Sequence, residues 1–272
     1  PHAPLKIGTR GSPLALAQAY ETRQRLCQAL DIDVGAFEIV VIKTTGDKVL
    51  DRPLKEIGGK GLFTREIEED MLAGKIDIAV HSMKDMETTL ADGTRLAAVL
   101  PRDDRRDALV GPFQTLQDLP SGARVGTASV RRRALLLHHR PDLDIGLLRG
   151  NVNTRIAALQ DGQFDAIILA VAGLRRLGLD VDYAPLDLAV MPPSAGQGAL
   201  AIQTRDRDDP RSLAVMAASA DLGCAKTTTE VTAERALLGR LDGSCHTPIA
   251  ASATCNENGR LHLDGMILSE DG

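Results

Sequence analysis

Lys84 and Asp85 are the first residues of this sequence whose types and positions indicate chemistry. They follow the apolar run Ile76–Val80, which predicts a short buried strand after the turn at Gly74. In open α/β sheets, ligands bind just outside the carboxyl ends of the strands. An ammonium group and a carboxylate at such a strand end can bind and polarise a small molecule, although a surface ion pair explains the two residues equally well.

Arginines are concentrated in one part of the chain. Between residues 124 and 155 there are seven arginines, no lysine and only two aspartates. Arg131 and Arg132 lie in the first turn of a helix that Ser129 is predicted to cap, where the helix dipole disfavours a positive charge. We therefore interpret these two as ligand-binding residues. The arginines without such a placement are expected to be solvated: Arg133, Arg140, Arg175 and Arg176.

A second helix start carries arginines in a similar position. Arg149 follows the apolar strand predicted at 145–148, and Asn151 is the predicted N-cap of a helix that contains Arg155. Cations at two helix N-termini do not stabilise the helices. They therefore indicate a site for several carboxylates or phosphates.

A third candidate anion site lies near the start of the sequence. A strand is predicted at 5–9 and a helix from Pro13 to about Leu30, with Ser12 as its N-cap. Backbone N–H groups at this helix start and the guanidinium of Arg10 can bind a carboxylate, although an ordinary capped helix beside a surface arginine fits as well. The glycine spacing does not match G-x-G-x-x-G, so dinucleotide binding has little support.

Two further candidate residues lie in glycine-rich segments. Lys60 stands among three glycines in a long polar stretch, which favours either a flexible surface loop or a mobile cation that closes over an acidic ligand. Cys245 occupies a Gly-Ser turn next to His246, where a thiol with a lowered pKa would be nucleophilic. A small packed cysteine is the commoner explanation. Adjacent strand residues point to opposite faces, so the pair is not by itself a catalytic dyad.

The composition excludes several classes of protein. The 272 residues are 43% hydrophobic and 25% charged, which is typical of a soluble chain of two or three domains, and no run approaches the ~20 apolar residues of a membrane span. A net charge of −5, six aromatic residues and no tryptophan argue against nucleic-acid binding. The four cysteines show no CxxC pair or zinc spacing, so we expect no metal site and a reducing cytoplasmic environment.

Two stretches of the chain repeat each other in the same order. Residues 125–129 resemble 7–12, with a strand, Gly-Thr, a serine cap and a helix, and residues 159–167 resemble 72–79. A charged segment at 101–107 interrupts the apolar pattern between the copies and is a candidate crossover. These repeats predict two similar α/β domains that face each other across a cleft, which is a preferred place for a small-molecule site.

Several motifs closely resemble the porphobilinogen deaminase (hydroxymethylbilane synthase) family and follow its order from near residue 5 to the end. They are 9–18 (TRGSPLALAQ), 58–63 (GGKGLF), 81–85 (HSMKD), 126–132 (GTASVRR), 148–155 (LRGNVNTR), 195–199 (AGQGA) and 243–245 (GSC). The sequence departs from the common pattern at 86–88, where Met-Glu-Thr replaces Val-Pro, and at Ala128, where a serine is common.

The resemblance implies an α/β fold of three domains. Two of them resemble periplasmic binding proteins and flank a cleft, and a small α+β domain carries the cofactor. The limits are 1–100 with 200–220 for the first domain, 105–194 for the second and 221–272 for the third. The third domain is a few tens of residues short for the family, so its final helix is expected to be missing. A cytoplasmic monomer without nucleic-acid or membrane partners is implied.

The resemblance also implies the reaction. Members of this family are transferases of tetrapyrrole (heme) biosynthesis that condense four porphobilinogen molecules head to tail into hydroxymethylbilane, with release of ammonia. A dipyrromethane cofactor is held in thioether linkage to a cysteine, which by motif is Cys245, and the implied catalytic residues are Asp85 and Lys84. The implied cofactor- and substrate-binding residues are Arg10, Ser12, Gln18, Lys60, Ser82, Thr127, Ser129, Arg131, Arg132, Arg149, Gly150, Asn151, Arg155 and Gln197.

The chemistry of the charged residues agrees with this reaction. Porphobilinogen carries an acetate and a propionate, so a growing chain presents many carboxylates to arginines at helix N-termini. Loss of ammonia leaves a cationic azafulvene-type intermediate, whose charge a fixed anionic Asp85 can stabilise. Without the resemblance, the same residues favour a two-domain anion-binding protein of the periplasmic type or an intracellular ligand-sensing domain. A catalytically inactive relative that binds pyrrole acids is a third alternative.

Overall fold

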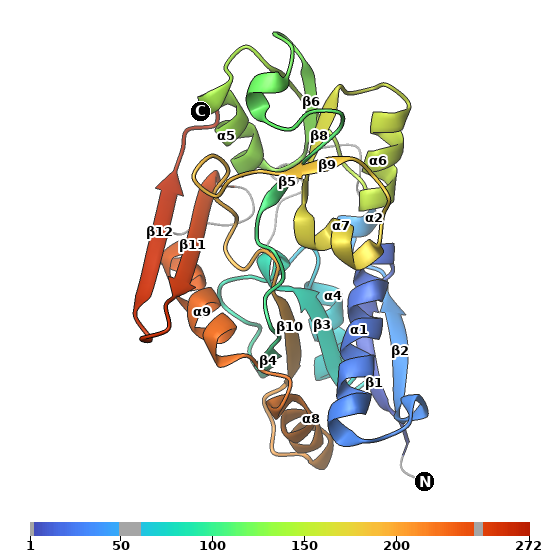
Figure 1. Cartoon of the computed structure of the whole chain (residues 1–272). Coiled ribbons are helices and arrows are strands. Elements are labelled where there is room, and N and C mark those ends of the chain that lie inside the picture. The colour runs from blue at the N-terminus through green and yellow to red at the C-terminus, as the bar shows by residue number, and fades with distance from the viewer. Residues whose placement is uncertain (1–2, 49–60, 242–246) are drawn as a thin grey trace.

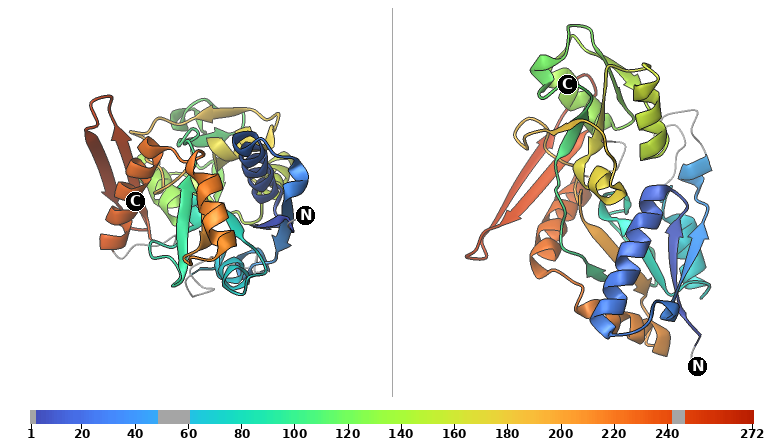
Figure 2. Two further views of the ribbon diagram at one scale, coloured as in Figure 1. Left: turned by 90° about the horizontal axis from the view of Figure 1, so that it is seen from below. Right: turned by 45° about the vertical axis from the view of Figure 1, so that its right-hand side comes forward.

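The computed structural model describes residues 3–48, 61–241 and 247–272. Two five-stranded sheets and one two-stranded sheet organise this part of the chain. Figure 1 shows the two larger sheets as separate lobes, one near the N-terminus and one above it, with the small sheet along one side. Figure 2 shows the same three bodies from two further directions. The architecture is therefore α/β, as the sequence predicts.

The first lobe is built on a sheet with the strand order β2-β1-β3-β10-β4. β1 runs parallel to β2 and β3, whereas β10 is antiparallel to β3 and β4. The carboxyl ends of β1 and β3 therefore meet at one edge of the sheet. The strands are β1 (Leu5–Arg10), β2 (Phe37–Ile42), β3 (Ile78–Ser82), β4 (Thr94–Val99) and β10 (Leu200–Arg205).

Helices cover both faces of this sheet. α1 (Pro13–Leu30) and α8 (Pro210–Ala220) pack on one face around Ile7, and α4 (Arg65–Leu72) packs Ile67 against the other. Each fully buried side chain of this kind contributes about 1.5–3 kcal/mol to the free energy of unfolding. The resulting core holds the strand ends in fixed positions.

The start of α1 confirms the prediction made from local sequence. The hydroxyl of Ser12 accepts a hydrogen bond from the backbone N–H of Ala15 at 3.3 Å, and Pro13 is the first helical residue. The helix ends at Leu30, where the next residue, Asp31, adopts a left-handed conformation with φ of 50°. The N-terminus of α1 therefore lies at the same edge of the sheet as the end of β1.

The second lobe repeats the topology of the first. Its strand order is β7-β6-β8-β5-β9, with β6 parallel to β7 and β8, and β5 antiparallel to β8 and β9. The repeats in the sequence therefore correspond to two lobes of one topology. The strands are β5 (Asp107–Val110), β6 (Arg124–Thr127), β7 (Asp144–Leu147), β8 (Ala166–Ala170) and β9 (Tyr183–Pro185).

Helices also cover both faces of the second sheet. α5 (Val130–His139) packs on one face, and α6 (Val152–Gln160) and α7 (Val171–Leu177) pack on the other. The chain passes between the lobes at 100–106 and returns at 186–199. The predicted crossover is confirmed, and it ends one residue early because Asp107 already belongs to β5.

A third unit consists of one helix and a two-stranded sheet. α9 (Ala225–Arg240) packs against β11 (Ile249–Cys255), which pairs with β12 (Leu261–Ile267) in antiparallel register. Buried carboxylates of α9 attach this unit to the crossover. Glu234 accepts a hydrogen bond from Arg102 at 2.7 Å, and Glu230 accepts one from Arg105 at 2.9 Å.

Several boundaries differ from the sequence prediction. β3 lies two residues later than the apolar run that predicted it. α9 begins at Ala225, whereas the apolar pattern of the sequence predicts a helix only from Thr229 to Leu238. Thr227 is buried in that first turn and accepts a hydrogen bond from the backbone of Arg102, so tertiary contacts extend the helix through threonines of low propensity. The sequence did not predict β5, β9 or α7. The remaining elements are short: α2 (Thr45–Lys48), η1 (Val34–Ala36), η2 (Met83–Asp85) and η3 (Leu116–Asp118).

Two kinds of feature are absent from the described ranges. No helix there is both long and apolar enough to cross a membrane. Nor do three or more histidine, cysteine or acidic side chains of these ranges come together as a metal site.

Candidate functional site

A cavity of about 520 Å³ lies where the two lobes and the third unit meet. Its walls come from the ends of β1, β3 and β8 and from the starts of α1, α5, α6 and α7. The third unit contributes Leu238, Thr247 and Ile249. This volume is within the range of small-molecule sites. The cavity also lies outside the carboxyl ends of parallel strands, where ligands of α/β proteins bind.

The lining of the cavity is strongly cationic. Seven of the lining residues are lysine or arginine, whereas two are aspartate. A concave surface with this imbalance attracts anions. The cations are Arg10, Lys43, Lys84, Arg131, Arg132, Arg149 and Arg155, and the carboxylates are Asp47 and Asp85.

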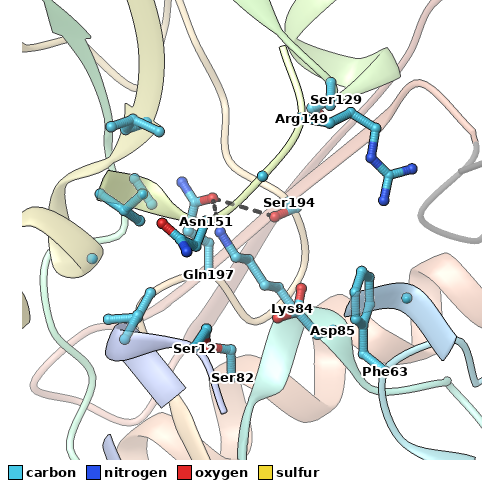
Figure 3. Close-up of a pocket in the computed structure, with 18 of the residues that line it drawn as sticks. Ser12, Phe63, Ser82, Lys84, Asp85, Ser129, Arg149, Asn151, Ser194 and Gln197 are labelled. Carbon is cyan, nitrogen blue, oxygen red and sulfur yellow. Dashed lines mark hydrogen bonds between the residues drawn. The ribbon is translucent and has the colours of Figure 1, made fainter. Parts of the chain in front are cut away.

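Asp85 is the last residue of η2, a 3₁₀ helix of one turn that directly follows β3. Its Oδ2 lies 4.0 Å from Nη1 of Arg10, and 31% of its side chain is exposed. Figure 3 shows Lys84 and Asp85 together at the end of this strand. Because a buried strand and a tight turn hold the carboxylate at the cavity wall, it can stabilise positive charge on a bound molecule.

Lys84 precedes Asp85 in the same turn and is partly buried. Burial lowers the pKa of its ammonium group from 10.5 to about 8, and the charge of Arg132 acts in the same direction. Its Nζ donates to Oε1 of Gln197 at 3.4 Å, and the hydroxyl of Ser194 donates to the same oxygen at 3.5 Å (Figure 3). Lys84 is therefore a cation that a neighbouring carboxylate of a ligand would stabilise.

Gln197 connects the site residues of the two lobes. Its side chain is fully buried, and Nε2 donates to the backbone oxygen of Arg105 at 2.8 Å and to Oδ1 of Asp107 at 2.9 Å. Since Oε1 accepts from Lys84, one amide group bridges Lys84 of the first lobe and Asp107 of the second. This predicted residue thus contacts the charged groups of the site.

Arg131 and Arg132 lie in the first turn of α5, as predicted, but the structure gives them a carboxylate within the chain. Asp107 accepts from Nη2 of Arg131 at 2.7 Å and from Nη2 of Arg132 at 2.7 Å. Burial acts to raise the pKa of Asp107, but the two guanidinium charges outweigh it and hold the pKa well below its ordinary range. Two cations thus share one anion, and Nε of Arg131 is buried without a hydrogen-bond partner among the described residues.

Asp107 was not identified from the sequence. It stands at the end of the charged crossover, 24 residues before Arg131, in a segment that also contains Asp103 and Asp104. The one available signal was the apolar Ala-Leu-Val that follows it, which begins β5. Pairing of β5 with β8 brings the carboxylate under the start of α5.

Arg155 and Arg149 lie at the start of α6. Nε of Arg155 donates to the backbone oxygen of Gly150 at 2.9 Å, and Arg155 forms no ion pair within the described part of the chain. Burial and, to a smaller extent, the charges of Arg132 and Arg149 lower the pKa of Arg155 from 12.5 to about 10. A guanidinium held among other cations in this way is stabilised when an anion binds.

The remaining predicted side chains form the hydrogen bonds that shape the wall. Ser82 accepts from Nε2 of Gln18 at 2.9 Å, and Ser129 accepts from the backbone of Arg132 at 3.3 Å. Thr127 in turn accepts from the backbone of Ser129 at 3.2 Å. Gln18 and Thr127 are buried. The residues at the surface of the cavity are Ser12, Ser82, Ser129, Gly150 and Asn151.

Lys60 and Cys245, together with the glycines at 58 and 59, lie outside the described residues. Thr247, two positions after Cys245, lines the cavity.

Two further lining residues were not predicted as functional. Asp47 accepts hydrogen bonds from Nε and Nη2 of Arg10, and the ring of Phe63 lies 4.2 Å from the guanidinium carbon of the same arginine. The polar stretch that contains Asp47 carried no local signal of a buried pair. Phe63, one of only four phenylalanines, stood in a recognised motif but was not assigned a role.

The prediction that four other arginines are solvated was wrong for at least two of them. Arg140 donates to Asp142 at 2.7 Å and to the backbone oxygen of Leu116 at 2.6 Å. Arg176 joins the lobes, because its Nε donates to Oε2 of Glu21 in α1 at 3.3 Å. Each of these side chains stabilises a loop or a lobe contact, and neither lines the cavity.

The residues present fit a ligand with several carboxylates. The lining holds more cations than anions, Arg155 has no ion pair among the described residues, and Nε of Arg131 is a buried donor without an acceptor. Buried polar groups of this kind are normally satisfied, so a multiply anionic ligand would complete the site.

Comparisons with known proteins identify related sequences over nearly the whole chain. Residues 5–212 match the family model described as "Porphobilinogen deaminase, dipyromethane cofactor binding domain", and residues 228–272 match "Porphobilinogen deaminase, C-terminal domain". A curated protein from Paracoccus denitrificans named porphobilinogen deaminase is 54% identical over 274 residues, which cover 100% of this chain and 86% of the relative. One of the same name from Nitrobacter winogradskyi is 52% identical over 269 residues, covering 98% and 83%.

The solved structures that match this chain are much more distant in sequence. The alkanesulfonate-binding protein SsuA from Xanthomonas axonopodis pv. citri bound to MOPS is 19% identical, with 89% of this chain and 76% of that chain covered and a TM-score of 0.41. The substrate-binding protein of an amino acid ABC transporter is 14% identical, covering 88% and 94%, with a TM-score of 0.38.

Proposed function

Because this chain belongs to the porphobilinogen deaminase family of enzymes of tetrapyrrole synthesis, which hold a dipyrromethane cofactor, we propose that it condenses four porphobilinogen molecules head to tail and frees hydroxymethylbilane by hydrolysis. Four ammonia molecules are released and one water molecule is consumed for each product. The observation that supports this most strongly is the cationic cavity with Asp85 at its wall. Each pyrrole unit brings an acetate and a propionate, so a chain of pyrroles needs many cations and few anions around it.

We propose that Cys245 is the attachment point of the cofactor. Sulfur adds readily to the electrophilic carbon of such a pyrrole, and a thioether is then persistent. Thr247, two positions after Cys245 in the sequence, and Ile249 line the cavity. When bound, the cofactor supplies the free pyrrole carbon to which the first substrate is joined.

The carboxylates of cofactor and substrate are assigned to the cations of the cavity wall. Arg155 and Nε of Arg131 are the clearest candidates, and Arg149 stands beside Arg155 at the start of α6. Arg132 and Lys84 add charge from the second and first lobes. The other residues proposed to line or shape this binding surface are Arg10, Ser12, Gln18, Lys60, Ser82, Thr127, Ser129, Gly150, Asn151 and Gln197.

Asp85 is proposed to act on the reacting carbon. In each condensation the aminomethyl C–N bond of porphobilinogen breaks, ammonia leaves, and the methylene carbon becomes positively charged. The fixed carboxylate of Asp85 stabilises this charge more in the transition state than in the neutral substrate, which is what lowers the barrier. The methylene carbon then bonds to the free pyrrole carbon of the chain, and that carbon loses its proton.

Lys84 is proposed to hold a substrate carboxylate next to Asp85. Its pKa of about 8 leaves it charged at neutral pH, and partial burial strengthens its attraction to an anion. Lys84 donates a hydrogen bond to Gln197, which itself donates to Asp107 of the second lobe, so the position of Lys84 depends on both lobes.

The remaining proposals concern organisation and environment. We assign domain limits of 1–100 with 200–220, 105–194 and 221–272, supported by the two sheets and the third unit described above. We also propose that the chain is a monomer. A reducing cytoplasm is consistent with the free thiols of Cys27, Cys224 and Cys255.

Turnover of porphobilinogen tests this function. The purified protein should release one ammonia for each porphobilinogen consumed, and mass spectrometry should identify a linear tetrapyrrole as the product. Asp85→Asn should lose most turnover, whereas Asp142→Asn, in the turn between α5 and β7 and outside the cavity lining, should retain it. Binding of porphobilinogen without release of ammonia would instead favour a binding protein or an inactive relative.

A further inference from the structure

The guanidinium of Arg10 is held on three sides within the cavity. Asp47 accepts from its Nε at 3.1 Å and also from its Nη2, and Phe63 stacks on its flat face at 4.2 Å. The remaining nitrogen, Nη1, lies 4.0 Å from Oδ2 of Asp85. Asp47 is therefore a bidentate partner of Arg10, and only Nη1 of Arg10 approaches Asp85, the proposed catalytic carboxylate.

Asp47 is itself fixed by its neighbours. The buried hydroxyl of Thr44 donates to its Oδ2 at 2.7 Å. The next residue, Thr45, donates from its backbone N–H and its hydroxyl to Oε1 of Glu66, at 2.8 and 2.5 Å. Because Glu66 belongs to the first turn of α4, these hydrogen bonds fix the short helix α2 against α4, which packs on the sheet of the first lobe.

The ring on the other side of Arg10 depends on the same short helix. Gly46 lies directly under Phe63, and a Cβ at this position would be 2.2 Å from Cε1 of the ring. The backbone N–H of Gly46 donates to the oxygen of Leu62 at 2.8 Å, which fixes the two segments relative to each other. α2 thus supplies both the carboxylate and the space for the ring that enclose Arg10.

We propose that Asp47 is a positioning residue of this site, which holds Arg10 so that only Nη1 faces Asp85 and the ligand. This inference rests on the proposed function, since it assigns Asp47 a part in the same reaction. A flexible arginine without such a partner would form a bidentate pair with the nearest carboxylate, which is Asp85. That pair would occupy the oxygen atoms that stabilise the substrate cation. Asp47 prevents it by competing for the same edge of the guanidinium.

A double-mutant cycle tests whether Asp47 acts through Arg10. Asp47→Asn should lower kcat by about 10- to 100-fold, because misplacing a charged group by about 1 Å has an effect of that order, with a smaller change in KM. In an Arg10→Gln background the same substitution should lower kcat by less than about 3-fold, since the residue that it positions is gone. Asp47→Glu should recover part of the lost kcat in the native background.

A matched control distinguishes this effect from loss of any arginine–aspartate pair. Asp142 also makes a two-point contact with an arginine, Arg140, and neither residue lines the cavity. Asp142→Asn should change kcat by less than about 2-fold. Equal losses from Asp47→Asn in the native and Arg10→Gln backgrounds would overturn the proposal, as would wild-type kcat in Asp47→Asn.

A second measurement does not depend on turnover. The Nε–H of Arg10, assigned in a proton–nitrogen NMR spectrum by its absence in Arg10→Gln, should be shifted and slowly exchanging because it donates to a carboxylate. Asp47→Asn should move this signal to the position and exchange rate of a solvated arginine. An unchanged signal would overturn the pairing, whereas lack of porphobilinogen turnover with a responsive signal would refute the proposed function alone.

Discussion

Arg155 provides a test that separates a binding residue from a structural one. In the folded chain its pKa falls from 12.5 to about 10, mainly through burial and then through the charges of Arg132 and Arg149. Each pH unit corresponds to about 1.4 kcal/mol, so holding this charge without an anion costs roughly 3 kcal/mol. A lowered pKa of a base means that the charged form opposes folding. At neutral pH the cost is fully present, and it is relieved only as the pH rises through about 10.

A neutral replacement should therefore stabilise the cofactor-free protein. Partial exposure screens part of the cost and reduces it to about 2–3 kcal/mol. Loss of the hydrogen bond from Nε to Gly150 removes about 1 kcal/mol of stability. The free energy of unfolding of Arg155→Gln should then exceed that of the unsubstituted protein by about 1–2 kcal/mol. At roughly 2–4 °C per kcal/mol for a chain of this size, the midpoint of thermal unfolding should rise by about 2–8 °C.

The assay is calorimetry in two backgrounds, with porphobilinogen turnover as the second readout. In the Cys245→Ser background, which lacks the cofactor, Arg155→Gln should raise the midpoint of thermal unfolding. With Cys245 intact, this rise in the midpoint should shrink or change sign, because ligand carboxylates neutralise Arg155. Turnover of porphobilinogen by Arg155→Gln should fall at least about 10-fold. Arg140→Gln is the control and should lower the midpoint in both backgrounds. If Arg155→Gln destabilises both backgrounds equally, Arg155 is structural and the reasoning fails.

Three further predictions follow from individual contacts. Asp107→Asn should lower the free energy of unfolding by about 3–5 kcal/mol at neutral pH, because it leaves two buried guanidinium groups unpaired. The folded-state pKa of Asp107 is depressed, so the stability that its carboxylate contributes is present above about pH 4 and is lost as the pH falls further. Denaturant titrations should therefore show the difference in free energy of unfolding between Asp107→Asn and wild type narrowing below about pH 4. Gly46→Ala should displace Phe63 and lower kcat about 10-fold without abolishing folding. Lys84 loses its charge above about pH 8, so kcat/KM should decline there, and Lys84→Arg should move this decline to higher pH.

The elements that depend on local signals were predictable from the sequence. Ser12 and Pro13 specify the start of α1, and Ser129 and Asn151 specify the starts of α5 and α6 by the same capping chemistry. Because these caps follow strands, the sequence also indicated that helix N-termini and strand ends meet. The second copy of this pattern was enough to predict two lobes of one topology.

The partners of the charged residues were not predictable in the same way. Arg131 and Arg132 were identified correctly as unusual, but Asp107 reaches them only through the antiparallel pairing of β5 with β8. Asp47 reaches Arg10 through a turn that follows another strand, 37 residues away. Sequence reasoning finds charges that a helix disfavours, whereas the acids that compensate them depend on long-range strand pairing.

The most direct test of the account is the intact mass of the protein purified from cells that make porphobilinogen. The mass should exceed that of the polypeptide by two porphobilinogen units less two ammonia, which corresponds to a covalent dipyrromethane. Cys245→Ser should have the unmodified mass, whereas Cys224→Ser, which changes a partly exposed thiol elsewhere, should retain the addition. An unmodified wild-type mass, or an addition that persists in Cys245→Ser, would contradict the proposed attachment and with it the central claim.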